Sequence, residues 1–85
     1  MKSISISEYN QSMGQIIDVE DNYTFSIKHV PNALNIPYET LLYNKDNLLD
    51  KNKIYYIYCQ GGHKSRRAVN ILTAYGFKVV QVLLN

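Results

Sequence analysis

Cys59 is the only cysteine of this 85-residue chain, and a glycine-rich, basic segment follows it directly. The segment runs Gln60-Gly61-Gly62-His63-Lys64-Ser65-Arg66. Glycine reaches positive φ without strain, so the backbone N–H groups of such a loop can converge on one point and bind an anion. A cysteine in these surroundings is typical of a reactive nucleophile, whereas a cysteine that only packs in a core needs none of them.

Two predicted elements position this loop. Ile54–Tyr58 is a continuous run of strand formers, which predicts a strand buried on both faces of a parallel sheet. Residues 66–75 follow helical spacing, and Gly76 is placed to end that helix. The predicted apolar face of the helix consists of Ala68, Ile71, Leu72 and Tyr75. Cys59 is thus expected at the carboxyl end of a central strand, where open α/β sheets bind ligands.

The predicted loop and the helix N-terminus together form an anion site with a sulfur at its base. The unpaired N–H groups of a helix N-terminus carry a partial positive charge. A thiolate is itself an anion, so these amides and the cations Lys64 and Arg66 predict a pKa of Cys59 below its ordinary value of about 8.5. The residues by themselves therefore predict an activated nucleophile that faces an anionic substrate.

The rest of the chain alternates short strands with short helices. Strands are expected at a sheet edge around Ile4 and Ile6, and at residues 15–19, 33–36 and Lys78–Leu83. Helices are expected at residues 8–13, between Ser7 as cap and Gly14 as end, at Tyr38–Tyr43, and for one turn around Leu48 and Leu49. This alternation predicts one α/β domain over residues 1–85, with a small parallel sheet and helices on both faces.

Composition and charge exclude several classes of protein. The chain is 46% hydrophobic and 19% charged, as expected for a small globular domain rather than a disordered or fibrous chain. A net charge of +2 is too small to indicate nucleic-acid binding. The longest apolar run, residues 54–59, is too short to span a membrane. The lone cysteine and an N-terminus without an apolar h-region predict a reducing, cytoplasmic location.

Several segments, in the same order, resemble the rhodanese homology domain. The active-site pattern of that family corresponds to Cys59, two residues, Gly62, two residues, Ser65 and Arg66, followed by a helix. Residues 16–20 resemble the "LIDVRE" strand of the family, residues 25–37 its "F..GHIPGAINIP" segment, and residues 77–82 the strand after the active-site helix. The resemblance covers nearly the whole chain and implies the rhodanese-like three-layer fold, here with a short C-terminus.

The resemblance also implies an activity, that of a rhodanese-type (thiosulfate) sulfurtransferase. Cys59 would be the catalytic residue, would take sulfane sulfur from thiosulfate or another persulfide donor, and would pass it to a thiol or to cyanide. The expected anion-binding loop consists of Gln60, Gly61, Gly62, His63, Lys64, Ser65 and Arg66. No metal and no organic cofactor is implied.

Two residues outside the loop are expected to support it. Asp18 ends a predicted strand, where its carboxylate is expected to hold loop backbone. His29 is expected to be hydrogen-bonded near the turn at residues 30–32.

This sequence departs from the family pattern at four places. Glu20 stands where the family has arginine, Lys28 and Asn32 stand where it has glycine, and the sequence ends at Asn85, before the further helical segment of the family. Asn32 is a mild change, because asparagine tolerates a left-handed turn. With the short C-terminus, one wall of the fold is expected to be either missing or supplied by a partner, a second copy or another protein.

Two alternative functions remain open at this point. Cysteine-dependent phosphatases and arsenate reductases need arginine after five intervening residues, a position that Ser65 occupies here, with Arg66 one residue late. The second alternative is a non-catalytic binding or regulatory module. Glu20 and the short C-terminus favour it, whereas the intact cysteine loop opposes it.

Overall fold

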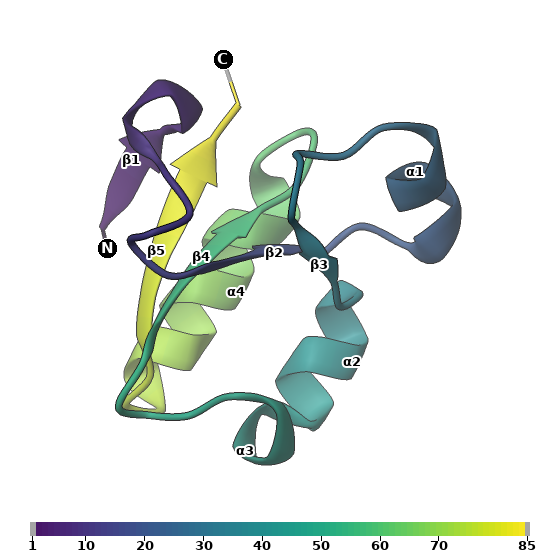
Figure 1. Ribbon diagram of the computed structural model, residues 1–85. Coiled ribbons are helices and arrows are strands. Elements are labelled where there is room, and N and C mark those ends of the chain that lie inside the picture. Colours follow the sequence, from purple (N-terminus) through teal and green to yellow (C-terminus); the bar gives the residue numbers. More distant parts are fainter. Residues whose placement is uncertain (1, 85) are drawn as a thin grey trace.

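The computed structural model describes residues 2–84, whose strands form one parallel five-stranded sheet (Figure 1). The strand order is β1-β5-β4-β2-β3, and all four neighbouring pairs are parallel. The strands are β1 (Ser3–Ser5), β2 (Gln15–Asp18), β3 (Leu34–Asn35), β4 (Ile54–Tyr58) and β5 (Lys78–Leu83). The predicted α/β class, the parallel sheet and the edge strand near the N-terminus are confirmed.

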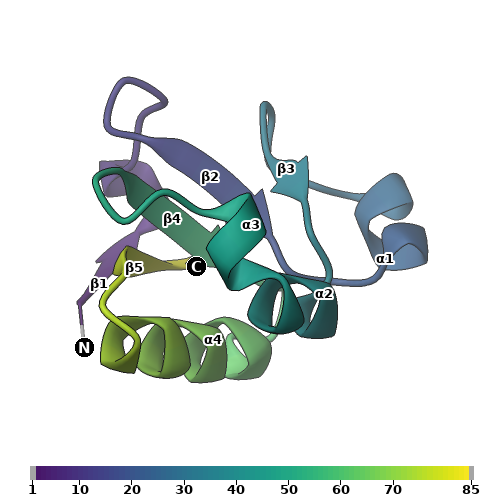
Figure 2. The same ribbon diagram turned by 90° about the horizontal axis from the view of Figure 1, so that it is seen from below.

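Helices cover one face of the sheet in a thick layer (Figure 2). The helices of the chain are η1 (Ile6–Glu8), α1 (Asn22–Ile27), α2 (Tyr38–Tyr43), α3 (Lys45–Leu48) and α4 (His63–Ala74). Leu41 of α2 and Leu72 of α4 are fully buried in a cluster that includes Ile17, Ile57 and Val79 of the sheet. This cluster is the main core, and it holds α4 directly beneath β4 and β5.

The opposite face of the sheet is covered by a thinner layer. The side chains that this face presents are Ile16, Tyr56, Tyr58, Val80 and Val82. The residues that pack on them come from η1, its flanks, the segment before β3 and the end of β5, namely Ile4, Ile6, Tyr9, Val30, Ala33 and Leu84. Strand β4 therefore contributes alternate residues to two cores, which explains its nearly continuous apolar sequence.

Tyr58 joins the sheet to this thinner layer through its hydroxyl group. The side chain is fully buried, and its hydroxyl oxygen accepts a hydrogen bond of 2.9 Å from the backbone N–H of Val30. Burial, and the nearby carboxylate of Asp18, raise the pKa of Tyr58 well above its usual range. The tyrosines of β4 are core residues, as predicted.

The helix predicted at residues 8–13 is wrong, and a helix that was not predicted follows β2. Ser5 caps the short helix η1 and forms a capping box with Glu8, so the cap lies two residues before the predicted Ser7. The other helix, α1, begins after Asp21, whose carboxylate accepts the N–H of Thr24 at 2.8 Å. Because α1 buries no residue, its sequence carries no apolar period that would have predicted it.

Helix α4 begins three residues earlier than predicted, and its buried face is different. Its buried residues are Ser65, Ala68, Val69 and Leu72, which share one face of the helix. Ile71 and Tyr75 were predicted to face inward, but they are 36% and 58% exposed. Serine at the first buried position concealed the true face in the sequence. Tyr75 instead lies beneath the ammonium group of Lys45, 4.3 Å from the ring centroid.

No helix among residues 2–84 is long and apolar enough to cross a membrane.

Candidate active site

The sulfur of Cys59 lies at the carboxyl end of β4, against the first turn of α4. The residue is only 4% exposed. Its Sγ accepts hydrogen bonds from the backbone N–H groups of Gly62, at 3.2 Å, and Ser65, at 3.3 Å. Gly62 has a φ of 85°, so a left-handed residue turns the chain from the loop into the helix. This turn is what aims both amides at the sulfur.

Further backbone N–H groups of the same loop have no acceptor among the described residues. Among the described residues, no acceptor bonds the N–H groups of Gly61, His63 and Lys64. His63 and Lys64 belong to the first turn of α4, where N–H groups have no partner within the helix. These amides and the positive end of the twelve-residue helix can bind a charge that develops beyond Sγ.

Gln81 of β5 holds this turn in place through two hydrogen bonds. Its side-chain Nε2 donates to the carbonyl oxygen of Gly62 and to Oγ of Ser65, each at 2.9 Å, and the residue is 3% exposed. Oγ of Ser65 lies 3.5 Å from Sγ of Cys59 and 3.2 Å from the Gly62 carbonyl oxygen. With Gln81 as its donor, the Ser65 hydroxyl has one hydrogen left for either acceptor.

Sequence reasoning missed Gln81, although a signal for it was present. It is the one polar residue between Val79 and Leu83. A glutamine at an inward-facing position of a buried strand needs hydrogen-bond partners.

Replacement of Gln81 by leucine is expected to lower the free energy of unfolding by about 1–3 kcal/mol, because the buried Ser65 hydroxyl loses its donor and the Gly62 carbonyl loses one of its donors. Urea unfolding measures this difference. Gln15→Leu on β2 is the matched control, since that glutamine is exposed, and it should lower the free energy by less than about 1 kcal/mol. Equal losses for the two variants would contradict the buried role of Gln81.

Glu20, which follows β2, also holds the loop through both of its carboxylate oxygens. One carboxylate oxygen, Oε2, accepts the backbone N–H of Gln60 at 2.8 Å, and the other, Oε1, pairs with Nζ of Lys64 at 2.9 Å. Glu20 is 8% exposed, whereas the Lys64 side chain is 49% exposed. The hydrogen bond to Glu20 raises the pKa of Lys64.

Asp18 and His29 both hydrogen-bond to backbone groups, those of Glu20 and Phe25. The buried carboxylate of Asp18 accepts the N–H of Glu20 at 2.8 Å and so orients the residue that ties the loop. The Nδ1 atom of His29 lies 2.7 Å from the carbonyl oxygen of Phe25, on whose ring the imidazole stacks. Asn32 adopts a φ of 70°, the left-handed turn that the sequence allowed.

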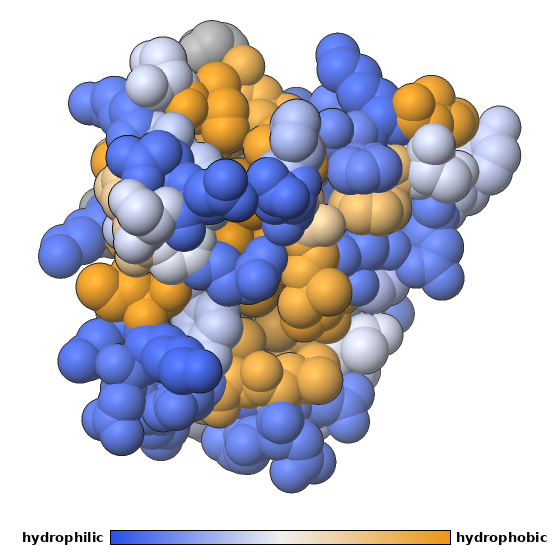
Figure 3. All heavy atoms as spheres, in the orientation of Figure 1, coloured by the Kyte–Doolittle hydropathy of each residue, from blue (hydrophilic) through white to orange (hydrophobic). Residues whose placement is uncertain are grey.

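A cavity of about 260 Å³ opens beside Cys59. Its lining residues are Cys59, Gln60, Gly61, Gly62, Val82, Leu83 and Leu84, none of them charged. The surface at the carboxyl end of β5, which forms one wall, is hydrophobic (Figure 3). A neighbouring cavity of about 460 Å³ shares Gln60 and Leu84 and extends to Lys28 and His29. Space for a substrate therefore lies over the sulfur, with an aliphatic wall on one side.

Some of the predicted loop residues do not line this cavity. Among the described residues, the exposed guanidinium of Arg66 has no hydrogen-bond or ion-pair partner, and the backbone N–H of this residue donates to the Gly62 carbonyl. His63 is exposed at the start of α4. The side chains of His63, Lys64 and Arg66 all lie outside the set that lines the cavity.

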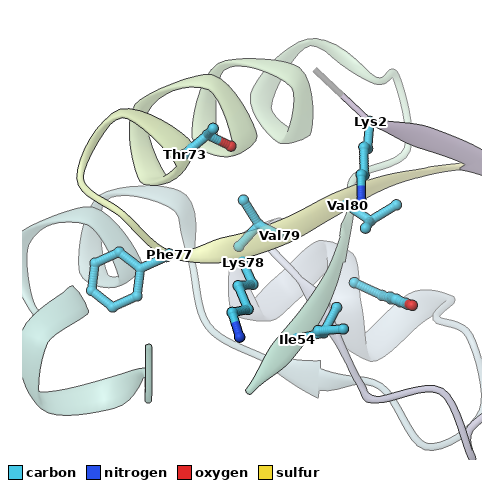
Figure 4. Close-up of a pocket in the computed structure, with 8 residues that line it drawn as sticks. Lys2, Ile54, Thr73, Phe77, Lys78, Val79 and Val80 are labelled. Carbon is cyan, nitrogen blue, oxygen red and sulfur yellow. The ribbon is translucent and has the colours of Figure 1, made fainter. Parts of the chain in front are cut away.

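The opposite edge of the sheet holds a cavity without a thiol or a carboxylate. It measures about 450 Å³ and lies at the amino ends of β4 and β5 (Figure 4). Its lining residues are Lys2, Ile54, Tyr56, Thr73, Phe77, Lys78, Val79 and Val80, none of which offers a thiol or a carboxylate. Within residues 2–84, no cluster of His, Cys, Asp and Glu side chains could hold a metal ion.

Comparison with known proteins agrees with this geometry. The family model of the Rhodanese-like domain matches residues 5–85. The chain belongs to the rhodanese-like domain family. The resemblance and the rhodanese-like fold expected from the sequence are thereby confirmed.

Solved structures of other rhodanese-like domains superpose closely on this one. The rhodanese-like domain protein of Staphylococcus aureus is 35% identical, with a TM-score of 0.81, and the match covers 96% of this chain and 84% of that chain. SSP1007 of Staphylococcus saprophyticus reaches a TM-score of 0.86 at 29% identity, over 96% of this chain and 86% of that chain.

One curated relative carries a sulfurtransferase name. The adenylyltransferase and sulfurtransferase uba4 of Ogataea parapolymorpha is 32% identical over 63 residues, which are 74% of this chain. The matched part is 16% of uba4, so this rhodanese-like domain resembles a small portion of that protein.

Proposed function

We propose that this rhodanese-like domain is a sulfurtransferase that carries a sulfane sulfur on Cys59 as a persulfide. The observation that supports this most directly is the set of backbone N–H groups around Sγ. Two of them bond the sulfur itself, and those of Gly61, His63 and Lys64 are open. Such a set stabilises a thiolate first and then the terminal sulfur of a persulfide anion, because both are anions at nearly the same place.

The first half-reaction loads the sulfur. The Cys59 thiolate attacks the outer sulfur of the donor, the sulfur–sulfur bond of thiosulfate breaks, and its electron pair leaves with sulfite. Cys59 then carries a persulfide anion, which we place against the open amides of the loop. In the second half-reaction an acceptor thiolate, or cyanide, attacks the outer sulfur and restores the Cys59 thiolate. Charge and sulfur balance in both steps without a metal or an organic cofactor.

Phosphoryl transfer fits these residues less well. The position at which a cysteine-dependent phosphatase needs arginine is Ser65, which is buried and turned toward Sγ and the Gly62 carbonyl. A tetrahedral phosphate needs a bidentate cation at this place, and serine cannot supply one. We also place the domain in the cytoplasm, where reducing conditions keep the lone thiol of Cys59 free.

The proposal is tested by sulfur uptake. The purified protein is incubated with an excess of thiosulfate or of an organic persulfide, desalted, and its intact mass recorded. A gain of one sulfur atom that vanishes when Cys59 is first alkylated supports the proposal. Hydrolysis of an aryl phosphate without sulfur uptake would replace it by the phosphatase alternative. Absence of both activities would leave a non-catalytic module and overturn it.

A further inference from the structure

Glu20 places a fixed negative charge against the loop of the candidate active site, bonded to the backbone of Gln60, which lines the 260 Å³ cavity. Both of its carboxylate oxygens are engaged by the loop, at Gln60 and Lys64, and the residue is almost fully buried. Gln60 directly follows Cys59, so the carboxylate is held one residue from the nucleophile. Burial keeps this charge poorly screened by solvent, whereas Lys64, the cation that balances it, is half exposed and better screened.

The other cations of the loop do not offset this charge at the cavity. None of the lining residues of the 260 Å³ cavity is charged. Glu20 and Arg66 both lie outside the lining, but Glu20 is buried and bonded to the lining residue Gln60, whereas Arg66 is exposed to solvent, which screens its charge. The attraction for an anion there comes from open backbone amides, which suit one charge near the sulfur.

On these grounds we infer that Glu20 makes this site select singly charged sulfur donors over dianionic thiosulfate. The donor class is a terminal sulfur on a group that carries carbon, as in organic persulfides and thiosulfonates. This inference rests on the proposed function of Cys59. The second negative charge of thiosulfate would lie near the Glu20 carboxylate, on the other side of the Gln60 backbone, whereas a carbon group packs against the aliphatic lining residues Val82, Leu83 and Leu84.

The chemistry of the two donor types is otherwise the same. Methanethiosulfonate and thiosulfate both present one outer sulfur to the Cys59 thiolate. In each case the sulfur–sulfur bond of the donor breaks, a new one forms at Cys59, and the electron pair leaves with methanesulfinate or sulfite. The two donors differ by one unit of charge at nearly equal size, which makes their kcat/KM ratio a measure of charge selection.

The decisive variant is Glu20→Gln. Glutamine keeps an oxygen that accepts the Gln60 N–H and removes only the charge. We expect the ratio of kcat/KM for thiosulfate to that for methanethiosulfonate to rise about fivefold, the effect of one unit charge at short range in a partly screened site. A ratio within twofold of the wild-type ratio in a folded Glu20→Gln protein would overturn the inference.

Two further variants keep the test independent of how well Glu20→Gln folds. Lys64→Gln removes the cation that pairs with Glu20. It is expected to lower the ratio of kcat/KM for thiosulfate to that for methanethiosulfonate, because no cation then neutralises the Glu20 carboxylate. Asp21→Asn is the matched control: Asp21 is an exposed carboxylate that caps α1 and makes no hydrogen bond to the loop. Asparagine caps helices equally well, so the ratio should change by less than about twofold. A rise of the ratio in Lys64→Gln, or an Asp21→Asn effect equal to that of Glu20→Gln, would overturn the inference.

A third donor, the persulfide of 2-mercaptoethanol, separates charge from leaving-group chemistry. If Glu20 discriminates between donors by their charge, kcat/KM for this monoanion changes in Glu20→Gln by the same factor as for methanethiosulfonate. If kcat/KM for this persulfide instead changes by the factor seen for thiosulfate, the inference fails. If all three donors load Cys59 but the ratio of kcat/KM for thiosulfate to that for methanethiosulfonate is the same in Glu20→Gln and wild type, the inference fails and the proposed function stands. Failure of every donor to load Cys59 overturns the proposed function, and the inference with it.

Discussion

Cys59→Ser is expected to abolish sulfur transfer, by at least about 10⁴-fold, and to leave the fold intact. A serine hydroxyl is a far weaker nucleophile than a thiolate at neutral pH and forms no persulfide. Its oxygen can still accept the N–H groups of Gly62 and Ser65 that now bond Sγ. The free energy of unfolding should therefore change by less than about 1.5 kcal/mol.

Thiocyanate formation from cyanide and a sulfur donor measures the loss of activity, and urea unfolding measures stability. Cys59 is the only cysteine of the chain, so no second thiol can substitute for it. Residual activity of the Cys59→Ser protein above a tenth of the wild-type rate would contradict the covalent mechanism. A collapse of stability would contradict the view that the loop is held by its backbone contacts, by Gln81 and by Glu20.

Gly14→Ala is expected to destabilise the domain by about 2–4 kcal/mol, a large part of the stability of so small a domain. Gly14 precedes β2 with a φ of 155°, and a Cβ placed on it would lie 2.5 Å from the backbone carbonyl oxygen of Ile54. Backbone cannot rotate away as a side chain does, so either β4 or the connection before β2 must shift. The hydrogen bond of 2.7 Å that the Tyr9 hydroxyl donates to the Gly14 carbonyl would move with it.

Urea unfolding of Gly14→Ala beside Gly61→Ala checks this prediction. The control glycine has an ordinary φ, and a Cβ there would meet only the imidazole of His63, at 3.9 Å. Gly61→Ala should therefore change the free energy of unfolding by less than about 0.5 kcal/mol. If the two alanine variants were equally stable, the close approach of Gly14 to Ile54 would be refuted.

The elements that the sequence predicted well are those whose pattern is local and strong. β4 and β5 have the predicted bounds because β-branched and aromatic residues fill β4 without a break and dominate β5, where Gln81 is the interior exception. α1 was missed because it buries nothing, and a surface helix without an apolar stripe has no period to detect. The apolar face of α4 was misread because Ser65, a polar residue, begins it.

By itself, the sequence predicted Cys59 as the nucleophile and determined the kind of loop that surrounds it. Cys59 and the glycines after it are neighbours in the chain, so the turn that aims the Gly62 and Ser65 amides at Sγ follows from local backbone freedom. The family pattern also consists of short local segments, and it predicted the fold.

Only the tertiary structure decided which distant side chains reach this loop. Glu20 lies 40 residues from Gln60 in the chain and Gln81 lies 19 residues from Gly62, yet both bond the loop. They meet there because β2 and β5 flank β4 in a parallel sheet, which brings the ends of all three strands to one edge. The chain order alone states neither that strand order nor the direction of each side chain. The charge beside Cys59 and the support beneath it are therefore properties of the fold.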